Sequence, residues 1–237
     1  TGPRPGTRFA DTYDKLILSP GAKPLLPDFD TENERTFTLR TVEDTLKIRE
    51  FTDNNQIKTA VIIGGGFIGL EMAENLKNRG IDVTVIQKGD HLLNTVDSDI
   101  ASFIHTNLRA KNIHILLNTN VKSIENNLVI TDCKEIPADM VIVSVGVSPE
   151  NTLAKDAGLA LGVKGAIAVS DNMQTSDEDI YAVGDAVEVK NFISKDKAVI
   201  TLAGPANKAG RIAADNICGI CSTYKGTQGA SVIKLFD

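Results

Sequence analysis

The glycines of the segment GGGFIG carry the clearest chemical signal in the sequence. Gly64, Gly66 and Gly69 stand in the register G-x-G-x-x-G, directly after the apolar run 59–63. A strand that turns sharply into a helix leaves unpaired N–H groups at the helix start, and these groups bind phosphate. The first glycine permits the turn, the second admits a pyrophosphate, and the third lets helix and strand pack closely. The loop, with Gly65 and Ile68 included, is therefore predicted to bind a dinucleotide.

The elements around this loop predict a complete βαβ unit. The β-branched run 59–63 is typical of a strand buried on both faces. Helical spacing then continues to Gly80, and residues 82–86 supply a second strand. The alternative interpretation is a glycine-rich turn that only joins a strand to a helix. This alternative does not explain why three glycines, each of which loses conformational entropy on folding, stand in this loop.

The end of the second strand bears on which coenzyme the loop prefers. An NAD site usually carries Asp or Glu there for the ribose 2′-hydroxyl, but this strand ends in Gln87 followed by Lys88. Asp90 could substitute only if the loop folds back. A neutral amide beside a lysine tolerates or favours a 2′-phosphate, which a carboxylate would repel. The sequence thus favours NADPH or dual use, and the alternative is that Lys88 points into solvent.

Length and composition narrow the class of protein. The 237 residues, 42% of them hydrophobic, suffice for a sizeable core, and a soluble globular protein is expected. A formal net charge of −6 without any dense basic run argues against nucleic acid or an anionic membrane as partner. No apolar run approaches the roughly 18 residues of a membrane span, and residues 1–9 lack the order of a signal peptide. The cytoplasm is the expected location.

The cysteines are few and do not predict a disulfide framework or a metal site. Cys218 and Cys221 form a C-x-x-C after the helical pattern 205–217, which could be a redox dithiol or half of a metal site. A second Cys/His pair at matching spacing is missing, so two small residues at a helix end are the favoured interpretation. Cys133 is expected in a hairpin strand, without a chemical role.

The segments before the βαβ unit do not form a fold by themselves. Residues 14–18 predict a buried strand, and a proline-rich loop follows it. Helical spacing over 41–51 begins with Thr41 as N-cap and Asp44 in place of the usual Glu or Gln of a capping box. Residues 53–56 are expected to form a linker.

The segments after the unit continue a doubly wound sheet. A helix over 97–111 is expected to bury one apolar face, made of Ile100, Phe103, Ile104 and Leu108. Next come a strand over 113–117, a hairpin with strands 121–124 and 128–131, and an apolar strand over 139–145. Because strand ends at the carboxyl edge line the ligand crevice, Val145 and Gly146 are predicted to lie near the dinucleotide.

The last part of the chain is richer in loops. A short strand stops at Gly184 and Asp185, and helical spacing follows over 205–218. Residues 231–236 alternate like a strand and then reach the end of the sequence. Such a strand suggests a cut chain, although a natural edge strand would look the same.

Five blocks, in order, resemble the flavoprotein pyridine nucleotide-disulfide oxidoreductases, in particular the branch of coenzyme A disulfide reductase, NADH oxidase and NADH peroxidase. The blocks are YDKLILSPGAKP, GGGFIGLEMAENL, VIVSVGVSPEN, TSDEDIYAVGDA and LAGPANKAGRIAADNI. The resemblance implies an α/β fold in which a Rossmann-like NAD(P)-binding domain, three-layered with a β-meander, is inserted into a partial FAD-binding domain. It places the NAD(P) domain at 56–172, the FAD domain at 1–55 and 173–228, and the start of a dimerisation domain at 229–237.

The resemblance also assigns roles within the nucleotide loop. Gly64, Gly66 and Gly69 would hold the NAD(P) pyrophosphate, and Glu71 would stand near the nicotinamide. Phe67 matches an aromatic residue that covers the flavin and swings aside when nicotinamide arrives. Core packing is the alternative for Phe67.

For the flavin the resemblance is carried by the other blocks. Asp185 would bind the ribityl chain of FAD, with Gly184 leaving room for close approach, although this pair by itself could equally form a turn. Ser19 and Gly21 match a loop beside the adenosine part, and Asn207 matches a position close to the flavin.

Departures from the family pattern limit these implications. The family carries an earlier G-x-G-x-x-G for the FAD pyrophosphate, and nothing before residue 59 replaces it. The family's redox cysteine belongs to that same earlier section, so no catalytic residue is assigned here. Ser148 and Glu150 also replace basic and amide residues that are common around Pro149.

The sequence therefore predicts the central portion of an FAD-dependent NAD(P)H:disulfide oxidoreductase that acts on a small-molecule disulfide such as coenzyme A disulfide. The parent protein is expected to be a homodimer, and the isolated chain to bind NAD(P)H weakly with little turnover. Two alternatives stay open. One sends electrons to oxygen, peroxide or a carrier protein, and the other is a non-catalytic NAD(P)-binding module that senses redox state.

Overall fold

A computed structural model describes residues 10–236, so the polar lead-in 1–9 lies outside the described residues. The chain forms two compact units. Among the described residues, the flanking unit holds residues 10–22 together with Ser148–Ser231, and the central unit holds Lys23–Val147 together with residues 232–236. The chain thus passes between the units three times: within β2 (Ala22–Pro24), at the start of β11 (Val147–Pro149), and between Ser231 and Val232. These limits differ from the expected 56–172, and the assignment of domains to cofactors stays a prediction.

A parallel five-stranded sheet forms the middle of the central unit. Its strands, in spatial order, are β3 (Thr36–Phe37), β10 (Met140–Val143), β4 (Thr59–Ile63), β5 (Asp82–Ile86) and β6 (His114–Leu116). From β4 the chain continues outward through β5 and β6, and it returns to the opposite side of β4 with β10. The order therefore reverses beside β4, which is where open α/β sheets bind ligands.

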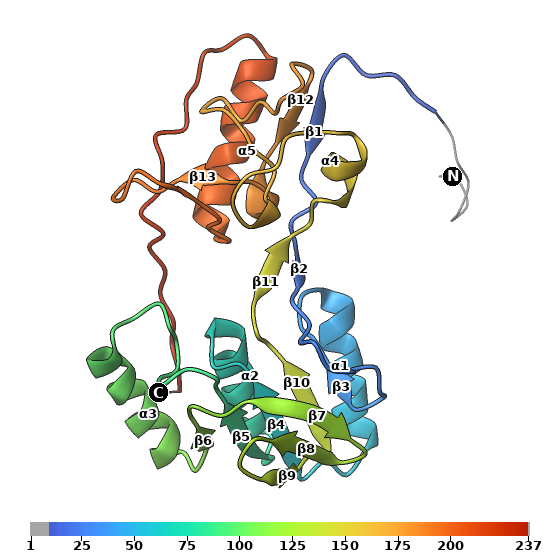
Figure 1. Ribbon diagram of the computed structural model, residues 1–237, viewed down its shortest axis with the longest axis vertical. Helices are drawn as coiled ribbons and strands as arrows, with labels where there is room; N and C mark the ends of the chain where they lie inside the picture. Colours follow the sequence, from blue (N-terminus) through green and yellow to red (C-terminus); the bar gives the residue numbers. More distant parts are fainter. Residues whose placement is uncertain (1–9, 237) are drawn as a thin grey trace. The chain divides into compact units, whose positions relative to one another are not determined.

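Each face of this sheet is covered by a different layer (Figure 1). Ala60 and Ile62 of β4 point into a core shared with the helices α1 (Val42–Asn54), α2 (Phe67–Asn78) and α3 (Ser98–Ala110). Val61 and Ile63 point into a second core under an antiparallel meander of β7 (Val121–Glu125), β8 (Leu128–Thr131) and β9 (Glu135–Pro137). The expected three-layer α/β fold with a strand buried on both faces is confirmed.

The local signals at α1 were correct in part. Thr41 caps the helix and forms a capping box with Asp44, whose carboxylate accepts the N–H of Thr41 at 2.9 Å. Burial alone would raise the pKa of Asp44, but these hydrogen bonds lower it. The expected linker over 53–56 is wrong at its start, because α1 continues to Asn54 and Asp53 forms ion pairs with Arg49 and Arg79.

The expected apolar face of α3 is also partly wrong. The helix buries Ala101, His105 and Leu108, whereas Ile100 and Phe103 are 51% and 73% exposed. The ring of His105 accepts the backbone N–H of Leu92 at 3.1 Å, Nε2 to N. A buried N–H group needs a partner, so this contact turns the His105 side of the helix inward.

Residues 231–236 were expected to form a strand, and this expectation is wrong. The segment has no strand pairing, yet Ile233, Leu235 and Phe236 pack on the helix-side core of the central unit. The Lys111 ammonium lies 5.3 Å from the centre of the Phe236 ring. The alternation of apolar residues therefore reflects packing of an extended segment beside α3.

The flanking unit is built around a parallel pair, β1 (Leu16–Leu18) and β12 (Ile180–Ala182). The helix α5 (Ala203–Ile217) packs on the core of this unit through Ala209 and Ala213 (Figure 1). The remaining elements are α4 (Thr152–Asp156), the 3₁₀ turns Val163–Gly165 and Gly184–Ala186, and the hairpin of β13 (Val189–Lys190) and β14 (Lys197–Ala198).

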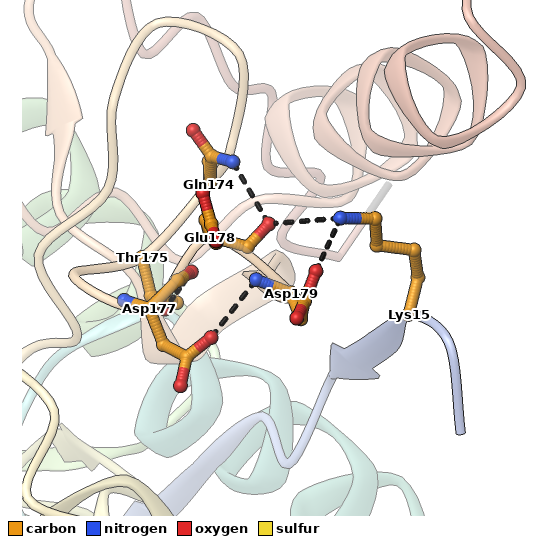
Figure 2. A network of polar contacts seen from close by, with 6 residues as sticks. All are labelled: Lys15, Gln174, Thr175, Asp177, Glu178 and Asp179. Carbon is orange, nitrogen blue, oxygen red and sulfur yellow. Dashed lines mark hydrogen bonds and ion pairs between the residues drawn. The ribbon is translucent and has the colours of Figure 1, made fainter.

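A network of polar contacts fixes the start of this strand pair (Figure 2). The Lys15 ammonium donates to the carbonyl of Glu178 at 3.2 Å and forms an ion pair with Asp179, which raises the pKa of Lys15. The amide of Gln174 donates to the same carbonyl at 2.9 Å. The N–H of Asp179 donates to the carboxylate of Asp177 at 2.9 Å. Lys15 thereby links the residue before β1 to the residues before β12.

The cysteines lie in exposed positions. Cys218 is the C-cap residue of α5, and Cys221 lies three residues after it. Cys133 does not lie in a strand, as was expected, but in the turn between β8 and β9. Within residues 10–236 no group of His, Cys, Asp and Glu is arranged to hold a metal ion. Over the same residues no helix combines the length and apolar character of a membrane span.

Candidate nucleotide site

The carboxyl ends of three strands meet at one edge of the central sheet. The N–H of Gly64 donates to Ile86 O, that of Gln87 to Leu116 O, and that of Ser144 to Ile63 O, each at 2.8 Å. These bonds continue the ladder just beyond the ends of the strands. They place the glycine loop, Gln87 and Ser144 side by side.

Two of the three motif glycines are required by the protein's own packing. Gly64 has φ +105°, and a Cβ there would lie 2.4 Å from Ser144 O. A Cβ at Gly69 would lie 2.0 Å from Gly64 O. At Gly66, in contrast, a Cβ would meet nothing within 4 Å. The protein leaves this position open.

The start of α2 offers free N–H donors beside Gly66. Gly66 is the N-cap residue and has no side-chain cap, and the first helical bond runs from the Leu70 N–H to Gly66 O at 3.0 Å. The N–H groups of Phe67, Ile68 and Gly69 therefore lack acceptors within the helix. None of the residues of this first turn is acidic. The positive end of the helix dipole is thus available to an anion.

A cavity of about 930 Å³ lies at this edge of the central unit. Eight of the predicted residues line it: Gly64, Gly65, Gly66, Phe67, Gln87, Lys88, Val145 and Gly146. Ile68, Gly69 and Glu71 are not among the lining residues. Gly69 packs against the sheet, and Glu71 is exposed one turn further along α2. The size is typical of a site for a cofactor.

The side chain of Gln87 is held by the protein. Its Oε1 accepts the N–H of Gly65 at 2.9 Å, and its Nε2 donates to Asn94 Oδ1 at 3.0 Å. Lys88 beside it is exposed at the cavity, and Asp90 pairs with His91 at 2.6 Å and does not line the cavity. No carboxylate from this strand end therefore takes the place of the missing Asp or Glu.

The loop 88–96 is anchored on both sides. The N–H of Leu93 donates to Gly65 O at 2.8 Å, which ties this loop to the glycine loop. The N–H of Leu92 is accepted by His105, as described above, and only a neutral imidazole can accept it. Burial lowers the pKa of His105, and the nearby Arg109 and His91 lower it further.

Several lining residues were missed from the sequence. The hydroxyl of Ser144 donates to Gly64 O at 2.9 Å and so fixes the turn. Its place directly after β10 is a signal that could have identified it, as it did Val145. Asn94, the segment Pro27–Phe29 and the start of the meander at Thr119–Lys122 also line the cavity. They lie on loops or at a strand start, and no sequence motif marks them.

In the flanking unit the predicted residues gather at the carboxyl end of the β1 and β12 pair. The N–H of Val183 donates to Leu18 O at 2.9 Å, so Ser19 and Gly184 leave the two strands at the same end. Gly184 has φ +82°, and Asp185 is half-buried in the turn that packs against α5. Gly21 lies two residues beyond Ser19 with φ +76°, and Asn207 is exposed on α5. Their roles toward a flavin stay predictions.

Residues 3–210 match the family model described as pyridine nucleotide-disulphide oxidoreductase. The chain belongs to this family. The glycine loop, the strand ends and the β1 and β12 pair all lie within the matched range.

Curated relatives within this family have related names. One is an NAD(P)H sulfur oxidoreductase (CoA-dependent) of Pyrococcus abyssi, 36% identical over 95% of this chain and 52% of the relative. Another is an NADH oxidase of Methanocaldococcus jannaschii, 36% identical over 98% of this chain and 53% of the relative. The chain thus spans about half the length of the curated relatives it matches.

Solved structures agree with the fold. The reduced CoADR-RHD of Bacillus anthracis matches with TM-score 0.93 and 44% identity, over 95% of this chain and 42% of the other. An NAD-dependent persulfide reductase from A. fulgidus matches with TM-score 0.95 and 37% identity, over 99% of this chain and 45% of the other. The α/β architecture with Rossmann-type folding is therefore shared with this family.

Proposed function

We propose that the central unit binds NAD(P)H, with the coenzyme diphosphate at the loop 64–69, as part of an FAD-dependent oxidoreductase. The observation that carries this proposal is the contrast among the glycines. At Gly64 and Gly69 protein atoms occupy the space that a Cβ would need. At Gly66 that space is open and lies beside free N–H donors. A glycine at an open position with ordinary φ serves close approach by a ligand.

The residues present fit a nicotinamide dinucleotide. The cavity has a volume of about 930 Å³, and its lining includes Phe67 and Val145 as well as Gln87 and Lys88. Phe67 supplies an apolar face, and the loop N–H groups supply donors for phosphate oxygens. Lys88 adds positive charge without a carboxylate from the same strand end. This combination supports NADPH or dual use, as the sequence suggests.

We also propose that the flanking unit contributes one part of a flavin site. Ser19, Gly184 and Asp185 lie at the carboxyl end of a parallel strand pair, the end at which such sheets bind cofactors. The positive φ of Gly184 lets the backbone turn sharply there. Bound FAD would supply two-electron chemistry, and the protein would supply position and field. Gly21 and Asn207 are assigned to this site by the family resemblance.

The acceptor is proposed to be a small sulfur compound, a disulfide or persulfide related to coenzyme A. The similarity to a CoA-dependent sulfur oxidoreductase and to a persulfide reductase supports it. Oxygen is the second candidate, because an NADH oxidase is equally similar to this chain. A homodimeric parent, a cytoplasmic location and the absence of nucleic-acid and membrane partners remain predictions.

Titration calorimetry of the 237-residue chain with NADH and with NADPH tests the proposed binding. We expect weak binding of at least one coenzyme and little disulfide reduction, because the chain spans about half the length of its relatives. No heat with either coenzyme at millimolar concentration would refute the nucleotide site. The proposal assigns this chain one part of a flavin site and not the whole. Rapid NADPH-dependent disulfide reduction by this chain alone would refute that assignment.

The non-catalytic alternative is tested at the level of the gene. An in-frame coding sequence for a flavin-binding βαβ unit upstream of residue 1 would exclude a module that only senses redox state. An upstream stop codon would support that module instead.

A further inference from the structure

The hydrogen bonds of Gln87 determine which atoms of Asn94 face the cavity. A backbone N–H can only donate, so the Gln87 atom 2.9 Å from Gly65 N is the acceptor Oε1. The other amide atom, Nε2, then faces Asn94 and needs an acceptor, which is Oδ1 at 3.0 Å. The orientation of both amides follows from one unambiguous donor.

The hydrogen bonds from Gly65 to Gln87 and from Gln87 to Asn94 form a relay. This relay leaves the two N–H donors of Asn94 Nδ2 unused. Its Oδ1 is engaged by Gln87, and no acceptor within residues 10–236 takes the hydrogens of its Nδ2. Asn94 is exposed and lines the cavity of the proposed nucleotide site. The side chain therefore offers the cavity an NH₂ group rather than a carbonyl oxygen.

We propose that Asn94 is a specificity-determining residue of this site, and that Gln87 is the positioning residue that turns its NH₂ group toward the coenzyme. This inference rests on the proposed binding of NAD(P)H. An NH₂ group binds acceptor oxygens, and the 2′-phosphate of NADPH carries three of them. The ribose 2′-hydroxyl of NADH is instead best held by an acceptor.

The charges around the cavity agree with this assignment. Lys88 and Lys122 line it from two different segments, and Asp28 is the one acidic lining residue among those described. Asp90, the nearest carboxylate in sequence, is paired with His91. Positive charge thus prevails at the cavity, as a phosphate group requires.

The relay also predicts what a carboxylate at position 87 would do. In Gln87→Glu one carboxylate oxygen still accepts the N–H of Gly65, but the other oxygen has no hydrogen for Asn94 Oδ1. The Asn94 amide would then rotate, donate through Nδ2, and present Oδ1 to the cavity. The substitution at position 87 would thereby replace the Asn94 donor Nδ2 at the cavity by the acceptor Oδ1.

Asn94→Asp tests the inference with little structural change. The aspartate keeps an acceptor for Gln87 Nε2 and replaces the presented donors by an anionic acceptor. Calorimetry of the full chain should show that NADPH affinity falls by roughly tenfold or more relative to NADH affinity. Asn78→Asp, on the exposed end of α2 away from the cavity, is the matched control and should leave this ratio unchanged.

Gln87→Glu is the second variant. It should shift the ratio toward NADH in the same direction, whereas a loss of loop structure alone would weaken both coenzymes equally. An unchanged ratio in both variants, with both coenzymes still bound by the wild type, would overturn the inference and leave the proposed function standing. Failure of the wild type to bind either coenzyme would overturn the proposed function, and this inference with it.

Discussion

The glycine loop of the central unit and the Gly184 turn of the flanking unit begin alike and are held differently. In each, a glycine with positive φ follows the carboxyl end of a parallel strand. β4 has neighbours on both sides, and a Cβ would lie 2.4 Å from Ser144 O at Gly64 and 2.0 Å from Gly64 O at Gly69. β12 pairs with β1 in a two-stranded sheet and forms one isolated antiparallel bridge, Tyr181 to Gln174. A Cβ at Gly184 would meet nothing within 4 Å. Packing thus determines the first turn, and backbone conformation alone determines the second.

The sharpest test of this difference is Gly69→Ala. The added methyl would lie 2.0 Å from Gly64 O and 2.8 Å from Ser144 Oγ, and a backbone atom cannot move away cheaply. We expect a loss of about 3 kcal/mol in the free energy of unfolding, measured by urea denaturation, and loss of coenzyme binding. An unfolding midpoint equal to that of the wild type would show that the loop is not held by packing.

Gly66→Ala is the matched substitution within the same loop. Its methyl meets no protein atom, and its φ of −84° suits alanine, so stability should change by less than about 0.5 kcal/mol. The methyl would, however, occupy the space of the proposed diphosphate. Calorimetry should show NAD(P)H affinity lowered by roughly tenfold or more, equivalent to about 1.4 kcal/mol. Undiminished affinity would contradict the role given to this glycine.

Gly184→Ala probes the second turn, where only the left-handed backbone disfavours a side chain. We expect a loss of roughly 1 kcal/mol, smaller than at Gly69, because no atom obstructs the methyl. Gly184→Asn should cost less, since asparagine tolerates this conformation better. Urea denaturation of both variants measures the difference. A loss as large as that of Gly69→Ala would show that packing also determines this turn.

The smallest expected effect concerns the anchor of the loop 88–96. The folded-state pKa of His105 is lowered, so the unfolded chain binds more protons near pH 6 and stability falls as pH decreases from 7.5 to about 5. His105→Gln provides a neutral acceptor for the Leu92 N–H and should flatten this slope in urea denaturation. His114→Gln, at an exposed position, is the control. An unchanged slope in His105→Gln would exclude His105 as its source.

Local patterns predicted the part of the fold that is local in sequence. The βαβ unit follows from spacing within residues 59–86, and the capping box at Thr41 and Asp44 follows from neighbours on one helix. The inward face of α3 could not be predicted in this way, because the Leu92 N–H that selects it lies on a different segment. The alternation over 231–236 likewise cannot distinguish a strand from an extended segment that packs on α3.

In the candidate site, too, the residues that belong to local motifs were predicted and those on distant segments were not. The glycines and the strand ends at Gln87 and Val145 follow from the motif and from the carboxyl-edge rule. Asn94 and Lys122 reach the cavity through a loop and a meander whose courses depend on distant contacts.

A crystal structure of the chain grown with excess NADPH tests the central claim most directly. We expect diphosphate oxygens about 3 Å from the backbone nitrogens at the start of α2, beside Gly66. Coenzyme density elsewhere, or an empty loop at saturating concentration, would contradict it.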